Sequence, residues 1–192
     1  MTRIVWVRHG PTHQRVFTGW RDVPADLSDA AALARLDAAL PSGALLVSSD
    51  LARARATADA LGRGRDRLPD DPRLREFDFG DWDGRHFSDI AETDPDLSRL
   101  YWEDPGAHAP PNGESWDAAA ARVDAAVADL LAQAEGRDIV AVAHLGVILT
   151  RWARASGLPP SRAIGQRIEP LSLTETRLDG GRWSAGRVGH VC

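Results

Sequence analysis

The chain has 192 residues, a formal net charge of −5, and 43% hydrophobic and 27% charged residues, which is the composition of a soluble globular protein. Its acidic balance gives no reason to expect binding to nucleic acid or to an anionic membrane surface. All 23 basic residues are arginines and Cys192 is the single cysteine. These counts exclude a GK[ST] P-loop, a lysine Schiff base, an internal disulfide and a thiolate zinc cluster.

The first half of the chain predicts two buried strands, each followed by a helix. The apolar run RIVWV is bounded by Gly10 and Pro11, and the leucines that follow Ser28 at helical spacing predict a helix that Ser28 can cap. A second apolar run, ALLVSS, leads into a helix that Asp50 can cap. The predicted strands are 3–7 and 44–49, and the predicted helices are 29–40 and 51–61.

The second half continues this alternation after a less regular stretch that is rich in Pro, Asp and Trp. Ser115 or Glu114 opens a long Ala-rich helix with an apolar stripe. Two apolar runs joined across residues 179–181 are typical of a terminal hairpin. The predicted helices are 87–93, 97–104, 115 to about 135 and 146–156, and the predicted strands are 138–144, 171–178 and 182–189.

This alternation predicts an α/β protein, a three-layer α/β/α sandwich with a mainly parallel central sheet. We expect a single domain over residues 1–192, with an insertion at about 85–113 that forms a cap. No apolar run approaches the ~18 residues of a membrane span, and the first strand begins without a charged leader. We therefore expect a cytoplasmic protein with no membrane partner, while the sequence leaves the oligomeric state open.

Polar side chains follow each of the main predicted strands. The first strand ends in Arg8 and His9, the third ends in His144, and Arg53 lies in the first turn of the helix after the second. Because parallel strands deliver their carboxyl ends to one edge of a sheet, we expect these four side chains to converge there. Helix N-termini add N–H donors and partial positive charge. The sequence therefore predicts an anion site, and its cations suit a phosphoryl group.

Each of these side chains also has a structural alternative. A single histidine at a strand end is more often a hydrogen-bonded structural residue, and a single arginine is more often salt-bridged. A metal site is a further alternative, since His9 and His13 are four residues apart. Gly10 and Pro11 disfavour the helix that such spacing needs, and the nearby arginines repel a cation. We therefore expect no metal.

Five segments add a more specific signal. They are VRHG at 7–10, SSDLARARATA at 48–58, LREFDFGDWDG at 74–84, NGESW at 112–116 and AVAHLGVI at 141–148. In this order they resemble the histidine phosphatase superfamily, the phosphoglycerate mutase-like proteins, over nearly the whole chain. The resemblance implies that family's fold, with no metal and no organic cofactor in its chemistry. It also implies His9 as the phosphoryl-accepting nucleophile, Arg8, Arg53 and His144 as ligands of the phosphoryl oxygens, and Glu76 as the proton donor.

The residues themselves are consistent with this chemistry. A neutral imidazole is a good nucleophile near pH 7, and water can discharge its phosphoryl adduct. Two guanidinium groups and a charged His144 would hold the non-bridging oxygens as charge shifts in the transition state. The departing alkoxide needs a proton, for which the residues alone offer Glu76, Asp78, Asp81 and Asp83. Only the resemblance selects Glu76.

Some positions depart from the family's pattern. Leu145 follows the second histidine where many members have a small residue, and its side chain either crowds the pocket or points into the core. Pro11 and Arg15 stand where mutase-type members have Glu and Asn, so the substrate-facing loop is reshaped. We expect Arg15, Thr18 and Gly19 as substrate contacts, with loop structure as the alternative for each.

The length of the chain favours a phosphatase over a mutase. Mutase-type relatives carry extra sequence that covers the site and excludes water from the phosphorylated intermediate. We therefore expect a metal-independent phosphatase that hydrolyses small phosphorylated metabolites through phosphohistidine. α-Ribazole phosphatases and sugar phosphate phosphatases are two candidate branches, between which the sequence does not choose. Mutase-type phosphoryl transfer and a non-catalytic phospholigand-binding protein on the same fold are the alternatives.

Overall fold

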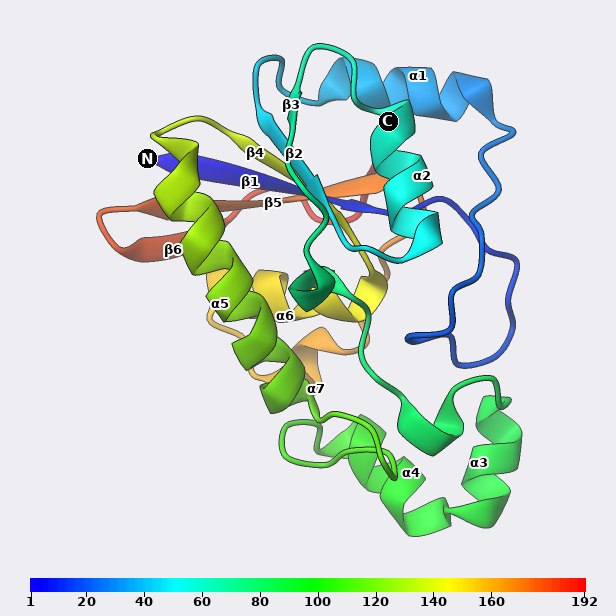
Figure 1. The fold of residues 1–192 in the computed structure, drawn as a ribbon. Coiled ribbons are helices and arrows are strands. Elements are labelled where there is room, and N and C mark those ends of the chain that lie inside the picture. The colour runs from blue at the N-terminus through cyan, green and yellow to red at the C-terminus, as the bar shows by residue number, and fades with distance from the viewer.

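The computed structural model describes residues 1–192, whose strands form one seven-stranded sheet (Figure 1). The strand order is β3-β2-β4-β1-β5-β6, and the short strand β7 also pairs with β5. The strands are β1 (Thr2–Arg8), β2 (Leu45–Ser48), β3 (Asp66–Arg67), β4 (Ile139–Ala143), β5 (Ser172–Asp179), β6 (Arg182–Ala185) and β7 (His190–Val191). The sequence prediction missed the two-residue strands β3 and β7, which are too short to show a hydrophobic pattern.

The four strands β3, β2, β4 and β1 are parallel neighbours. Arg8 at the end of β1 lies opposite Ala143 at the end of β4, and Ser48 at the end of β2 lies opposite Val142. The carboxyl ends of these three strands therefore meet at one edge of the sheet. Strand β5 runs antiparallel to β1, and β6 and β7 run antiparallel to β5. The predicted α/β class is confirmed, and the predicted terminal hairpin forms the antiparallel extension.

Helices cover both faces of the sheet (Figure 1). Alternate residues of β1 point to opposite sides of the sheet. Ile4 and Trp6 pack in one apolar cluster with α5 (Trp116–Ala134) and α6 (Leu145–Ser156), whereas Val5 and Val7 pack in another with α1 (Ala30–Ala39) and α2 (Ala52–Ala60). The three predicted layers follow from this alternation. The helices are α1 (Ala30–Ala39), α2 (Ala52–Ala60), α3 (Phe87–Thr93), α4 (Pro95–Glu103), α5 (Trp116–Ala134), α6 (Leu145–Ser156) and α7 (Pro160–Ala163), with 3₁₀ turns at Pro72–Leu74 and Gly80–Trp82.

Two of the predicted helix caps are wrong. Asp29, not Ser28, caps α1, and its Oδ1 accepts from the Ala32 N–H at 2.9 Å. The expected cap of α2, Asp50, instead pairs with the Arg75 guanidinium at 2.6 Å. The Ala52 N–H at the start of α2 donates to Asp22 of a distant loop, at 2.6 Å. Asp22, which is distant in the sequence, therefore accepts from the N-terminus of α2 in place of the neighbouring Asp50.

The predicted cap of α5 is confirmed, since Ser115 Oγ accepts from the Ala118 N–H at 3.2 Å. The two short helices α3 and α4 also lie where the sequence predicts helices, away from the sheet (Figure 1). They pack around a small apolar cluster of Trp82, Ile90 and Tyr101, separate from the two clusters of the sheet. None of the helices combines the length and the apolar character that crossing a bilayer requires.

Candidate active site

His9 lies just beyond β1 and is almost fully buried. Its backbone N–H donates to the Ala143 carbonyl of β4 at 3.1 Å, which continues the ladder between the two strands. Its Nδ1 lies 2.7 Å from the Gly10 carbonyl. Because a carbonyl only accepts, Nδ1 carries the proton, and the lone pair of a neutral His9 is on Nε2. Burial, with the charge of Arg53, lowers the pKa of His9 to about 3, so the ring is neutral near pH 7.

His144 lies at the end of β4 and at the start of α6, and its ring centroid is 5.0 Å from that of His9. Arg53 Nε donates to its Nδ1 at 3.2 Å, so the ring proton of His144 is on Nε2. Burial holds its pKa well below the usual value, with His9 and Arg53 acting in the same direction. Without a bound anion the ring of His144 is therefore neutral, with Nε2–H as a donor, in contrast to the charged His144 that the sequence led us to expect.

Arg53 comes from the first turn of α2 and is fully buried. Besides His144, its guanidinium donates to the carbonyls of Arg21 at 2.8 Å and Gly19 at 2.6 Å. Most of its donors therefore hold the loop after β1, and burial lowers its pKa. Arg8 is anchored by a single hydrogen bond of 2.6 Å from Nη1 to the Ile168 carbonyl, and burial lowers its pKa as well.

Two nitrogens at this edge of the sheet have no hydrogen-bond partner in the protein. They are Arg8 Nε and His144 Nε2, both buried. A buried donor without an acceptor is destabilising by ~1–3 kcal/mol, and more where the group is charged. An anion with several acceptor oxygens is the kind of ligand that relieves this penalty, and a phosphoryl group fits the positive charge around it.

Glu76 is the one acidic side chain that lines the pocket beside these groups. Its carboxylate accepts from the Phe77 N–H at 3.0 Å and from the Gly146 N–H at 3.0 Å, at the start of α6. Burial raises its pKa, whereas these N–H groups, Arg53 and Arg8 act in the opposite direction. A Cβ at position 146 would lie 2.5 Å from Glu76 Oε1, so only glycine lets the carboxylate approach.

The other three carboxylates offered by the sequence hold loops together. Asp83 accepts from the Gly19 N–H at 3.2 Å. Asp78 accepts from the Gly80 N–H at 2.9 Å, and Asp81 accepts from the Asn112 side chain at 3.0 Å. None of the three lines the pocket.

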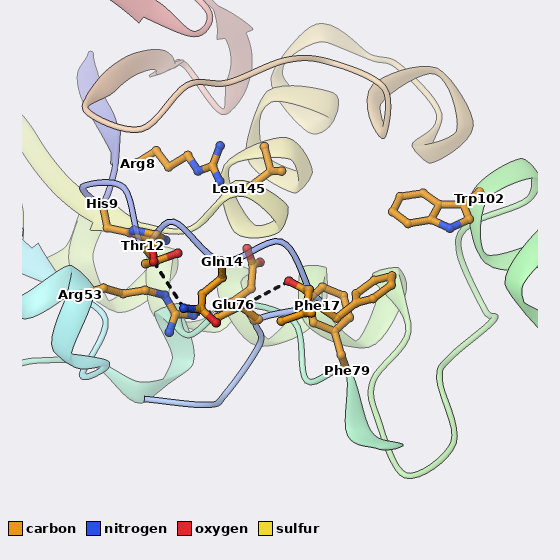
Figure 2. Close-up of a pocket in the computed structure, with 12 residues that line it drawn as sticks. Arg8, His9, Thr12, Gln14, Phe17, Arg53, Glu76, Phe79, Trp102 and Leu145 are labelled. Carbon is orange, nitrogen blue, oxygen red and sulfur yellow. Dashed lines mark hydrogen bonds between the residues drawn. The ribbon is translucent and has the colours of Figure 1, made fainter. Parts of the chain in front are cut away.

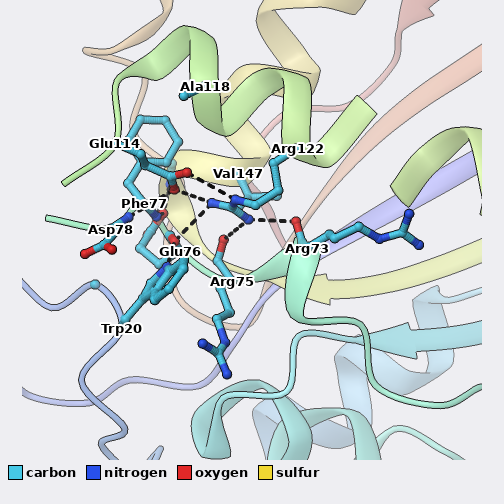
Figure 3. Close-up of polar contacts among 12 residues, drawn as sticks. Trp20, Arg73, Arg75, Glu76, Phe77, Asp78, Glu114, Ala118, Arg122 and Val147 are labelled. Carbon is cyan, nitrogen blue, oxygen red and sulfur yellow. Dashed lines mark hydrogen bonds and ion pairs between the residues drawn. The ribbon is translucent and has the colours of Figure 1, made fainter. Parts of the chain in front are cut away.

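The backbone around Glu76 is held by an arginine that the sequence reasoning missed (Figure 3). Arg122 of α5 donates through Nη1 to the carbonyls of Arg73 at 2.7 Å and Arg75 at 3.0 Å, and through Nη2 to that of Glu76 at 3.3 Å. Its guanidinium also pairs with Glu114. The sequence pointed to this contact only through the NGESW segment, which contains the partner Glu114, but Glu114 had no assigned role in the site.

Two further contacts hold the same segment. Trp20 Nε1 donates to the Glu76 carbonyl at 2.8 Å, so the loop after β1 is tied to the residue that carries the carboxylate. Arg75 lies over the Trp20 ring at 4.9 Å while it pairs with Asp50. The position of Glu76 therefore depends on α5, on the loop after β1 and on the loop before α2.

Arg8, His9, Arg53 and Glu76 line a pocket of about 250 Å³, whereas His144 lies behind His9 and is not part of the lining. Figure 2 shows Arg8, His9 and Arg53 on one side of the pocket and the rings of Phe17, Phe79 and Trp102 on the other. Glu76 lies between these two groups. The lining residues are Arg8, His9, Thr12, Gln14, Val16, Phe17, Thr18, Arg53, Glu76, Phe79, Trp102 and Leu145. The pocket therefore has a charged end and an aromatic end.

The residues expected to contact substrate lie in different places. Thr18 lines the pocket, whereas Arg15 lines an adjoining groove outside it. Gly19 contributes its carbonyl to Arg53, and a Cβ there would lie 2.4 Å from the Phe77 carbonyl, so close packing explains this glycine. Leu145 lines the pocket and also packs against the apolar cluster that contains Ile4 and Trp6, so its side chain does both of the things that the sequence left open.

The structure brings together no three His, Cys, Asp or Glu side chains in an arrangement that could hold a metal ion.

Comparison with known proteins identifies the family. The histidine phosphatase superfamily (branch 1) matches residues 4–190, so the chain belongs to this superfamily. The solved structure of Bacillus stearothermophilus YhfR superposes with a TM-score of 0.89 at 28% identity, over 100% of this chain and 98% of that one. The predicted phosphoglycerate mutase-like fold is thereby confirmed.

Curated relatives include proteins named as phosphatases. The adenosylcobalamin/alpha-ribazole phosphatase of Salmonella typhimurium is 31% identical over 191 residues, which cover 95% of this chain and 89% of that protein. The glucosyl-3-phosphoglycerate phosphatase of Mycolicibacterium vanbaalenii is 38% identical over 171 residues, which cover 82% and 75%. The chain spans about half the length (51%) of a bifunctional protein of Mycobacterium tuberculosis to which it is 34% identical.

Proposed function

We propose that the protein is a metal-independent phosphatase that hydrolyses small phosphomonoesters through a phosphohistidine at His9. One observation carries this proposal. The Gly10 carbonyl holds the proton of His9 on Nδ1, which leaves Nε2 as a nucleophile, and the unpartnered donors Arg8 Nε and His144 Nε2 are buried at the same edge of the sheet. A nucleophile next to unsatisfied donors is the arrangement that phosphoryl transfer requires.

In the first step, His9 Nε2 attacks phosphorus and the bond from phosphorus to the leaving oxygen breaks. Arg8, Arg53 and the Nε2–H of His144 stabilise the charge on the non-bridging oxygens. Glu76, whose pKa is raised by burial, gives its proton to the departing alkoxide, which leaves as the alcohol.

In the second step, water attacks the phosphohistidine. The Glu76 carboxylate takes a proton from this water, inorganic phosphate is released, and His9 returns to its neutral form. A neutral His144 suits both steps, because it donates a hydrogen bond without adding a third cation to a site that already holds two arginines. No metal is needed for this scheme, because the guanidinium groups carry the electrophilic role.

The substrates that the relatives' names describe, phosphorylated ribazoles and glucosyl-3-phosphoglycerate, belong to the proposed class of small phosphomonoesters. We treat residues 1–192 as one catalytic domain, with the segment at about 85–113 as its substrate-facing cap. Trp102 from this segment reaches the pocket that holds His9, which supports that role.

The test is phosphate release from a panel of phosphomonoesters, with and without EDTA, beside a 2,3-bisphosphoglycerate-dependent assay for isomerisation of 3-phosphoglycerate. We expect hydrolysis that survives the chelator, is inhibited by vanadate and is absent in His9→Ala. Loss of activity with EDTA that a divalent ion restores would contradict the metal-independent scheme. Isomerisation that outpaces hydrolysis would indicate a mutase, and tight binding of phosphorylated ligands without turnover would indicate a non-catalytic protein.

A further inference from the structure

An aromatic wall lines the pocket opposite its charged end (Figure 2). Phe17, Phe79 and Trp102 face the same space as His9 and Glu76. They come from the loop after β1, from the stretch before the second 3₁₀ turn, and from α4. Three segments far apart in the sequence therefore contribute a ring to one surface.

Edge-to-face packing holds these rings in place. The Phe17 ring meets that of Phe79 with centroids 4.7 Å apart, and Trp102 meets Tyr101 at 5.3 Å and 89°. Tyr101 in turn packs edge-on against Trp82 at 5.4 Å, and both of these side chains are buried. The wall therefore exists before any ligand binds, which lowers the entropy that a ligand must lose there.

The wall continues out of the pocket. Phe17 and Trp102 also line an adjoining groove of about 260 Å³, together with Phe87. Trp102 is 46% exposed and Phe87 is 62% exposed. Two exposed aromatic side chains beside the proposed phosphoryl pocket form an apolar surface that is continuous with it.

We propose that this wall is a leaving-group subsite and that the protein favours phosphomonoesters whose alcohol carries an aromatic ring. This inference rests on the proposed function, because the leaving group must lie next to Glu76 if Glu76 is its proton donor. A leaving oxygen that takes a proton from Glu76 has Phe79 and Trp102 as its neighbours further along the pocket. An aromatic ring on that alcohol packs against the wall and removes its exposed rings from water.

The experiment measures binding separately from turnover. Calorimetry compares 2-phenylethylphosphonate, 2-cyclohexylethylphosphonate and ethylphosphonate, none of which can be hydrolysed at the P–C bond. We expect the phenyl ligand to bind more than about 10-fold tighter than the ethyl ligand, because it buries apolar surface. It should also bind about 2- to 10-fold tighter than the cyclohexyl ligand, because aromatic pairs contribute beyond burial.

Variants of the protein then test whether the phenyl ring of the ligand binds against Trp102. Trp102→Ala should lower the ratio of phenyl to ethyl affinity, and Trp102→Phe should retain most of it. Trp183→Ala removes a tryptophan from β6, which is not part of the pocket lining, and should leave the ratio unchanged. Turnover of benzyl phosphate by the wild-type protein is measured in parallel.

Equal affinities for the phenyl and ethyl ligands, or no measurable binding of either, would overturn the subsite. A cyclohexyl ligand that binds as tightly as the phenyl ligand would overturn its aromatic character. A ratio that persists in Trp102→Ala would place the ring elsewhere and overturn it too. A preference that depends on Trp102, without phosphate release from benzyl phosphate, would support the subsite and contradict the proposed phosphatase activity.

Discussion

Arg53 Nε donates a hydrogen bond to Nδ1 of His144 at 3.2 Å, and this contact determines the tautomer of the histidine beside His9. A cation that donates to one ring nitrogen leaves the proton on the other, so His144 presents Nε2–H at the edge of the sheet. The two histidine rings have centroids 5.0 Å apart. Burial lowers the pKa of both rings, so the stability of the fold should depend on pH.

The buried histidines should make the fold sensitive to acid. The pKa of His9 is lowered to about 3 from 6.5, so below pH 6.5 the unfolded chain binds a proton that the folded chain does not. This contribution to the free energy of unfolding is fully present above about pH 6.5 and is lost as the pH falls toward 3. Urea unfolding at pH 7 and pH 4 measures the loss.

His9→Asn is the matched control for this effect, since it cannot take up the proton. We expect the variant to lose less unfolding free energy than the wild-type protein between pH 7 and pH 4. The contribution of Glu76, whose pKa is shifted in the opposite direction, cancels in the comparison. An equal loss in both proteins would mean that His9 titrates normally in the folded state.

The nucleophile should be detectable as a covalent adduct. Rapid quenching of the enzyme with labelled substrate should trap phosphate on a histidine, in a linkage that is labile to acid and stable to alkali. His9→Ala should abolish both the label and turnover, because only His9 offers a free ring nitrogen beside the unpartnered donors. Mass spectrometry of the labelled peptide identifies the residue. A label that remains in His9→Ala would show that another residue is the nucleophile.

Glu76→Gln should discriminate between leaving groups. The substitution keeps the size of the side chain and removes its proton, and acid catalysis is worth ~10²–10⁴-fold. We expect an alkyl phosphate, which expels a strongly basic alkoxide, to lose a factor in this range in kcat. p-Nitrophenyl phosphate expels a weakly basic phenolate and should lose much less.

Asp78→Asn, Asp81→Asn and Asp83→Asn are the controls for this prediction. Their carboxylates hold loops and do not line the pocket, so any loss should be the same for both leaving groups. Equal slowing of the two substrates by Glu76→Gln would make Glu76 a positioning residue.

Arg122 should act through the position of Glu76. Arg122→Met removes the donors to three backbone carbonyls around Glu76, and a small displacement of a catalytic group lowers rates by up to ~100-fold. We expect kcat to fall about 10- to 100-fold with little change in KM. The loss should be larger for alkyl phosphates than for p-nitrophenyl phosphate.

Arg73→Met is the matched control, because its guanidinium pairs with Asp71 and Asp129 at the surface and does not reach the pocket. It should leave the preference for leaving groups unchanged. If Arg122→Met slowed both substrates equally, the Arg122–Glu114 pair would contribute to folding stability and not to the place of the proton donor.

The sequence by itself determined the α/β class and the edge of the sheet where Arg8, His9 and His144 meet. The physical reason is local: short apolar runs form strands, and parallel strands carry their last residues to the same edge. The cap of α5 by Ser115 was likewise predictable, because a serine at that position accepts from the next turn of its own helix.

The family resemblance selected Glu76 among four carboxylates, but only the tertiary structure supplies the physical reason that this one lines the pocket. Glu76, Asp78, Asp81 and Asp83 lie close together in the chain, but the contacts from Arg122 and Gly146 that single out Glu76 come from 46 and 70 residues away. The same is true of the proton on His144, which depends on Arg53 of another helix, and of the aromatic wall, whose rings come from three segments. Such contacts depend on how the layers pack, and no pattern within one segment encodes that packing.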